Sequence, residues 1–153
     1  GYVQHVMENG PSALMPITIG RTFYMGVDPV MEQNNAIYRE QSILVQELAE
    51  KSDCVIVGRS ADYILRDKNP LRLFIYADME SRMERCRKRA PEQEHFTDKE
   101  LRRHIQDVDK RRSKYYQFFT GQTWGEKLNY DLCINTSGAN IEELVKVIAK
   151  LVK

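Results

Sequence analysis

Residues suited to binding oxyanions occur first at Gly58-Arg59-Ser60, which directly follows an apolar run of the chain. Glycine lets the backbone approach a ligand closely, and a guanidinium binds phosphate through two parallel hydrogen bonds. This tripeptide is therefore a candidate phosphate site. The alternative is a surface arginine paired with a carboxylate such as Asp62, and position alone leaves both interpretations open.

A strongly charged region follows at residues 82–114, which contain twelve Lys and Arg but only seven Asp and Glu. Arg82, Arg85 and Arg89 share one helix face at i, i+3 and i+7, and Asp109 and Arg112 share another. Two cationic faces over a pocket would stabilise a transferring phosphoryl group and exclude water. The arginines of these two faces, among them Arg82, Arg85 and Arg112, are therefore candidate catalytic residues.

Two other interpretations of the same charges stay open. A run of charges is more commonly a solvated surface laced with ion pairs. Nucleic-acid binding is weaker than either, because acidic residues are interspersed and no basic-aromatic motif accompanies them. A third candidate group, Thr136, Ser137 and Gly138, follows the last predicted strand and either contacts a nucleotide base or simply turns the chain.

Several chemistries are not supported. The histidines have no metal-ligand spacing, so we expect no metal site, and Ser60 is not in a G-x-S-x-G nucleophile motif. The three cysteines are widely spaced, as in reduced thiols of a cytoplasmic protein. No apolar run is long enough to cross a membrane, and no signal segment opens the chain. The net charge of +1 gives no general attraction to nucleic acid.

The elements that must position these residues alternate between strands and helices. Apolar runs predict strands at residues 54–57, 71–76 and 131–134. Helical periodicity and caps predict helices at residues 32–51, 61–65, 79–90, 97–118 and 140–151. The pattern favours a single α/β domain, residues 1–153, with a parallel sheet and helices on both faces.

Two regions of this domain differ from the rest. Residues 1–31 are rich in Gly and Pro and are predicted to be loop-rich, with a short strand at most at 17–19. Residues 79–121 form a polar helical hairpin, which we expect to be a mobile lid at the mouth of the sheet. Ligands bind beyond the carboxyl ends of parallel strands, which is where the candidate residues lie.

Several stretches resemble the cytidylate-kinase-like family of P-loop proteins. They are residues 54–65 (CVIVGRSADYIL), 73–76 (LFIY), 108–116 (VDKRRSKYY), 120–125 (TGQTWG) and 129–133 (NYDLC). The resemblance covers about residues 36–153 and leaves the first third unmatched, as a variable acceptor-side region. It implies a nucleoside-monophosphate kinase fold with an arginine-bearing helical lid.

The resemblance also implies roles for particular residues. Arg59 would hold the phosphate of the acceptor, Arg82 and Arg85 would meet phosphates from the lid, and Asp109 and Arg112 would contact the sugar and phosphate of the acceptor. The loop of Thr136, Ser137 and Gly138 would flank the adenine of the donor. Mg²⁺ would arrive with ATP as the substrate complex. Ile105 stands where cytidylate kinases carry a further arginine, which leaves cytidine specificity open.

The phosphate-binding loop of the family is missing. No G-x-x-x-x-G-K-[ST] occurs, and residues 17–21 (ITIGR), which echo the first strand of the family, precede Thr22-Phe23 instead of glycines. In the family fold this strand is central, so its absence would leave two unpaired edges in the sheet. We therefore expect a P-loop-lacking, inactive fragment of a phosphotransferase, unless another strand fills the position.

The leading function is transfer of a phosphoryl group from ATP to a nucleoside monophosphate-like acceptor. The alternatives are a non-catalytic nucleotide-binding or anion-binding regulatory module (a pseudo-kinase) and a structural fragment with a solvated charged surface. Nucleotides are the expected partners, membranes and nucleic acid are not, and a homodimer stays open.

Overall fold

The computed structural model describes residues 29–89 and 96–152. Our predictions for residues 1–28 and for the break before Phe96 lie outside these ranges. Residues 29–31 belong to a helix, so the predicted loop-rich region ends earlier than expected. The elements, in chain order, are α2 (Pro29–Lys51), α3 (Ala61–Ile64), η1 (Arg66–Lys68), β1 (Leu73–Tyr76), α4 (Met79–Arg89), α5 (Asp98–Thr120), η2 (Lys127–Asn129), β2 (Leu132–Asn135) and α6 (Ile141–Ala149).

The described sheet consists of two short parallel strands. β1 pairs with β2 from Leu73 opposite Leu132 to Tyr76 opposite Asn135. A side-chain contact joins the two strands just before they begin. The guanidinium of Arg72 lies 2.8 and 3.2 Å from the two carboxylate oxygens of Asp131. The chain crosses from β1 to β2 through α4 and α5, so the prediction of a parallel α/β arrangement is confirmed in this coarse form.

The predicted strand at residues 54–57 is wrong. This segment is neither helix nor strand, and the side chains of Val55 and Val57 are 94% and 87% exposed. An apolar run becomes an inner strand only when strands pair with it on both sides. Among the described residues no strand lies beside it, so the run stays unpaired.

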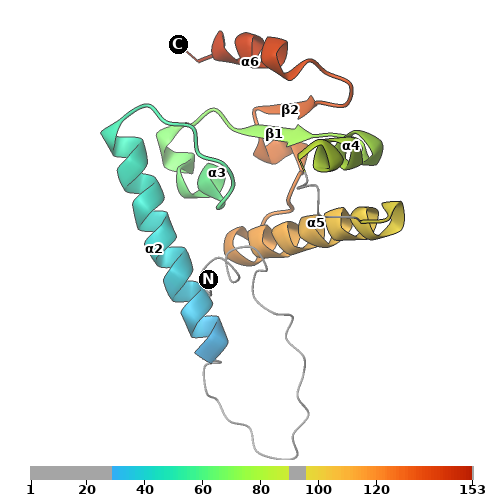
Figure 1. The fold of residues 1–153 in the computed structure, drawn as a ribbon. Coiled ribbons are helices and arrows are strands. Elements are labelled where there is room, and N and C mark those ends of the chain that lie inside the picture. Colours follow the sequence, from blue (N-terminus) through green and yellow to red (C-terminus); the bar gives the residue numbers. More distant parts are fainter. Residues whose placement is uncertain (1–28, 90–95, 153) are drawn as a thin grey trace, which may run out of the picture.

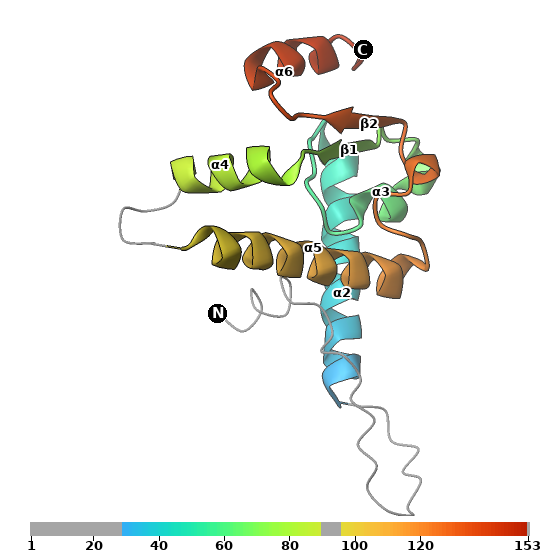
Figure 2. The same cartoon turned by 90° about the vertical axis from the view of Figure 1, so that its right-hand side faces the viewer.

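The helices α4 and α5 form the predicted hairpin and pack side by side (Figure 2). Met83 of α4 and Leu101 and Ile105 of α5 form a small buried cluster. α5 begins with a capping box: the Thr97 hydroxyl accepts from the Glu100 N–H, and the Glu100 carboxylate accepts from the Thr97 N–H. α5 ends at Gly121, whose φ is 70°.

A second cluster joins α2 to α3. Val45 of α2 packs with Ala61, Ile64 and Leu65. α2 also crosses the carboxyl end of α5, where the rings of Tyr38 and Phe119 stack at a centroid separation of 4.1 Å. α2 therefore contacts both α3, which follows the Gly58–Ser60 turn, and the carboxyl end of α5.

α6 lies beyond β2, on the opposite side of the strand pair from α3 and α5 (Figures 1 and 2). Asn140 caps α6, since its side chain accepts from the backbone N–H groups of Glu142 and Glu143. The Glu143 carboxylate pairs with Lys146. None of the residues of α6 is buried.

All three cysteines are free and exposed. Within residues 29–89 and 96–152, no helix combines the length and apolar character needed to span a bilayer.

Candidate functional site

The Gly58-Arg59-Ser60 turn has an unusual backbone. Its three residues all adopt left-handed conformations, with φ of 73°, 60° and 54°. Glycine adopts this conformation freely, but Arg59 and Ser60 do so at a cost of roughly 1–2 kcal/mol each. Such strain persists only where the surroundings enforce it and is most frequent at functional sites. The first predicted phosphate site is therefore a strained turn at the start of α3.

Arg82 and Asp109 form a two-pronged ion pair between α4 and α5. The Nη1 and Nη2 atoms of Arg82 donate to the two carboxylate oxygens of Asp109 at 2.6 and 2.7 Å, and both side chains are partly buried. The hydrogen bond to Asp109 raises the pKa of Arg82 above its usual value. The structure thus brings together a predicted lid residue and a predicted acceptor residue.

Arg85 connects α4 to the carboxyl end of β2. Its guanidinium donates to the side-chain hydroxyl of Thr136 at 3.0 Å and also to the backbone carbonyl of the same residue. Thr136 is buried, with 3% of its surface exposed. Ser137 accepts a hydrogen bond from the N–H of Asp78, and Gly138 has a φ of 64°. The predicted donor-base loop is therefore held by contacts to α4 and its N-cap.

Arg112 differs from the two lid arginines. It is exposed on α5, three residues after Asp109, and within the part of the chain that the structure describes its side chain forms no hydrogen bond or ion pair. Its guanidinium can therefore bind an oxyanion without first breaking a contact to the described residues. The roles proposed for Arg59, Arg82, Arg85, Asp109, Arg112 and the Thr136 loop stay predictions.

Sequence reasoning missed a polar group around Tyr115. The Tyr115 hydroxyl donates to the side-chain oxygen of Gln41 at 3.3 Å. Burial raises the pKa of Tyr115 to about 12, against a smaller opposing effect of the Arg59 charge. Gln41 Nε2 is one of three buried side-chain polar atoms without a hydrogen-bond partner among the described residues; the others are Ser60 Oγ and Arg111 Nε. Each of these atoms can donate a hydrogen bond.

A second missed contact joins α3 to α5. The hydroxyl of Tyr116, a residue that is 4% exposed, donates to Asp62 Oδ2 at 2.6 Å and lies 2.9 Å from Gln122 Oε1. Asp62, which the sequence offered as a partner for Arg59, thus accepts a hydrogen bond from Tyr116. This contact has no local sequence signal, because its two residues lie 54 positions apart.

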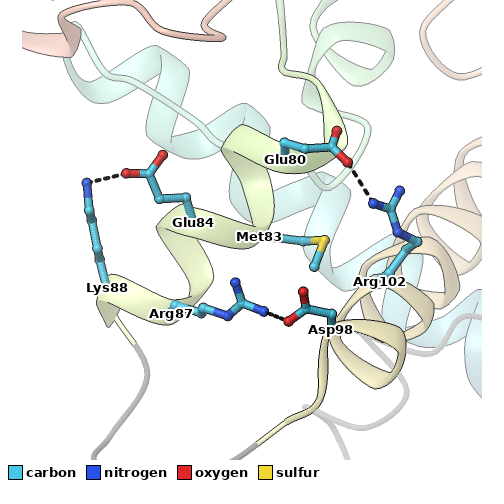
Figure 3. Close-up of a pocket in the computed structure, with 7 residues that line it drawn as sticks. All are labelled: Glu80, Met83, Glu84, Arg87, Lys88, Asp98 and Arg102. Carbon is cyan, nitrogen blue, oxygen red and sulfur yellow. Dashed lines mark hydrogen bonds and ion pairs between the residues drawn. The ribbon is translucent and has the colours of Figure 1, made fainter.

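A surface pocket of about 310 Å³ lies between α4 and α5 (Figure 3). Met83 forms its apolar part, and three ion pairs line the rest: Glu80 with Arg102, Arg87 with Asp98, and Glu84 with Lys88. These charges neutralise one another, so the pocket has no excess charge with which to attract an anion. None of the predicted site residues lines it. The described residues contain no cluster of His, Cys, Asp and Glu that could hold a metal ion.

Comparisons with known proteins agree with the sequence resemblance. A model of the cytidylate kinase-like family matches residues 2–138. The match includes the first third of the chain, which we had expected to be unmatched. A crystal structure of an uncharacterized protein from Eubacterium ventriosum ATCC 27560 is similar, with a TM-score of 0.68 and 29% identity over 82% of this chain and 67% of that one. No curated protein matches the chain.

Proposed function

Because this chain belongs to the cytidylate kinase-like family, we propose that it is the acceptor-binding and lid part of a phosphotransferase. The complete enzyme moves a phosphoryl group from ATP, bound as its Mg²⁺ complex, to a nucleoside monophosphate-like acceptor. The observation that carries this proposal is the convergence on α5: Asp109 pairs with Arg82 of the lid, and Arg112 lies exposed on the same face. Such reactions depend on positioning and charge neutralisation.

In this proposal the acceptor lies between the Arg59 turn and α5. Arg59 and Arg112 bind its phosphate through charge-assisted hydrogen bonds. The Asp109 carboxylate accepts hydrogen bonds from the sugar hydroxyls. Because Asp109 is paired with Arg82, sugar binding competes with that pair and frees the Arg82 guanidinium to meet the transferred phosphoryl group.

The donor side needs a polypeptide segment that the printed sequence does not contain. Binding the phosphates of ATP requires a turn of converging backbone N–H groups, which glycines allow, and no stretch of these 153 residues has that pattern. The exposed Val55 and Val57, together with the edge of β1 that faces away from β2, are suited to receive one further strand. We therefore expect the 153 residues alone to bind the acceptor but not to turn over ATP.

The test is a phosphoryl-transfer assay on the protein completed with such a glycine-rich segment, using nucleoside monophosphates as acceptors. Arg59→Ala should raise the KM for the acceptor tenfold or more, because hydrogen bonds to charged groups contribute roughly 1.5–3 kcal/mol. Arg103→Ala is the matched control, since Arg103 is an exposed arginine of α5 whose only ion pair among the described residues is with Asp107, one turn away.

Wild-type kinetics in Arg59→Ala would contradict the site assignment. Nucleotide binding without turnover by the completed protein would instead support the regulatory alternative. Absence of both binding and turnover with every nucleoside monophosphate would exclude the proposed function.

A further inference from the structure

The contact between Asp62 and Tyr116 joins two parts of the candidate site. Asp62 lies three residues after Arg59, in the first turn of α3, and Tyr116 lies four residues after Arg112 on α5. Their hydrogen bond is short, at 2.6 Å, and Tyr116 is buried. A charge-assisted hydrogen bond shielded from water is stronger than one at the surface.

The helical periodicity of α5 shows on which face of the helix this contact lies. Asp109, Arg112 and Tyr116 occur at i, i+3 and i+7 and therefore share one face of α5. The face that carries the predicted acceptor residues thus also carries the tyrosine that is bonded to α3. Any shift of α3 along or around α5 would change the separation of Arg59 from Arg112.

The turn that carries Arg59 needs such a restraint. Its left-handed residues are unfavourable on their own, and α3 has only four residues with which to hold them. Apolar packing of Ala61 and Ile64 fixes α3 to Val45 of α2. The Asp62–Tyr116 hydrogen bond connects the same turn to α5.

We propose that the Asp62–Tyr116 hydrogen bond positions Arg59 against the face of α5 that carries Asp109 and Arg112, and so sets the affinity for the phosphorylated acceptor. Tyr116 and Asp62 are positioning residues, because they act through Arg59. The effect on affinity rests on the proposed function, whereas the effect on the Arg59 turn does not.

The hydroxyl of Tyr116 is suited to this role over a wide pH range. Burial and the hydrogen bond to Asp62 both raise the pKa of Tyr116 far above its usual value. The phenol therefore stays protonated and remains a donor at neutral and moderately alkaline pH. Deprotonation of the phenol should therefore not break this contact up to about pH 9.

The test uses the 153-residue chain with Tyr116→Phe, which removes the hydroxyl and keeps the ring. Amide hydrogen exchange of residues 58–61, measured without ligand, should become faster. The Kd for CMP should rise about tenfold, which corresponds to about 1.4 kcal/mol. The Kd for cytidine, which has no phosphate for Arg59 to bind, should not change.

Two further variants separate positioning from a general loss of stability. Asp62→Asn keeps an acceptor oxygen and should restore most of the affinity that Asp62→Ala loses. Arg102→Gln, which breaks the ion pair with Glu80 between α5 and α4, serves as the stability control and should leave both CMP affinity and exchange at residues 58–61 unchanged.

Unchanged exchange at residues 58–61 in Tyr116→Phe and in Asp62→Ala would overturn the inference, and so would equal losses of affinity for CMP and cytidine. A wild-type chain that binds no nucleoside monophosphate would reject the proposed function. The exchange measurement would still decide whether the hydrogen bond positions the turn.

Discussion

At the scale of single residues, the arginines of the candidate site differ in the contacts that their guanidinium groups already form. Arg82 and Arg85 are both engaged, one with a carboxylate and one with the buried Thr136, whereas Arg112 is exposed. A ligand that binds the first two must replace existing hydrogen bonds, so its net gain there is small. The exposed Arg112 should therefore supply most of the initial affinity for an anionic ligand.

A residue-scale prediction concerns the packing of Phe74 in β1. Gly125 has a φ of 80°, and a Cβ at this position would lie 2.9 Å from Cζ of Phe74. Gly125→Ala adds both backbone strain and this clash, so we expect a loss of about 2–4 kcal/mol in the free energy of unfolding, measured by urea denaturation.

Gly121→Ala is the matched control for this prediction. Gly121 has a similar φ of 70° but nothing within 4 Å of the added Cβ, so only the strain of roughly 1 kcal/mol should remain. Equal losses in the two variants would show that Phe74 moves away at little cost.

At the scale of elements, the helices are specified by local signals. Thr97 and Glu100 fix the start of α5, Asp78 begins α4, and Gly121 ends α5. Capping of this kind depends only on residues close in sequence, which is why the helix boundaries were predicted to within a few residues.

The start of α5 gives the prediction at this scale. Thr97→Ala removes the oxygen that accepts from the Glu100 N–H and should destabilise the chain by about 1 kcal/mol. Thermal unfolding followed by circular dichroism at 222 nm measures the change. Thr123→Ala, at an exposed position whose side chain forms no hydrogen bond within the described residues, is the control, and equal shifts of Tm in both would contradict the role of the cap.

The strands and the site were predicted less completely, because both depend on contacts that are distant in sequence. Leu73 and Leu132 lie in strands as predicted, since they pair with each other. Residues 54–57 have an equally apolar sequence, but without neighbouring strands they form no ladder. The arginines were found by type and spacing, whereas the Asp62–Tyr116 contact joins residues 54 positions apart and has no local signal.

At the scale of the whole molecule, the described residues leave unusually large apolar areas uncovered. Val55 and Val57 are almost fully exposed, and α6 exposes Val145 and Val147 without burying any residue. A two-stranded sheet is also close to the lower limit of stability in water. In the proposed function, a further strand would cover part of this exposed apolar surface.

The whole-molecule prediction is therefore self-association of the 153-residue chain. Unpaired strand edges and exposed valines favour pairing between copies, so the apparent mass in light scattering should rise with protein concentration. Val55→Lys combined with Val57→Lys should reduce this association, because charged residues at an edge oppose pairing.

The control replaces exposed polar side chains of α5 by lysine, as in Gln106→Lys with Gln117→Lys, which adds the same charge away from the 54–57 segment. Equal suppression of association by both pairs would mean that net charge alone keeps the copies apart. A wild-type chain that stays monomeric at millimolar concentration would contradict the prediction.

The hydrogen bond between Arg72 and Asp131 spans 59 residues of chain, and the whole helical hairpin lies within that span. During synthesis on the ribosome, β1 therefore emerges long before β2 exists to pair with it. The hairpin, whose contacts are local, can fold first and bring the ends of the strands together. A substitution that slows hairpin formation should consequently prolong the time for which nascent β1 is accessible to chaperones.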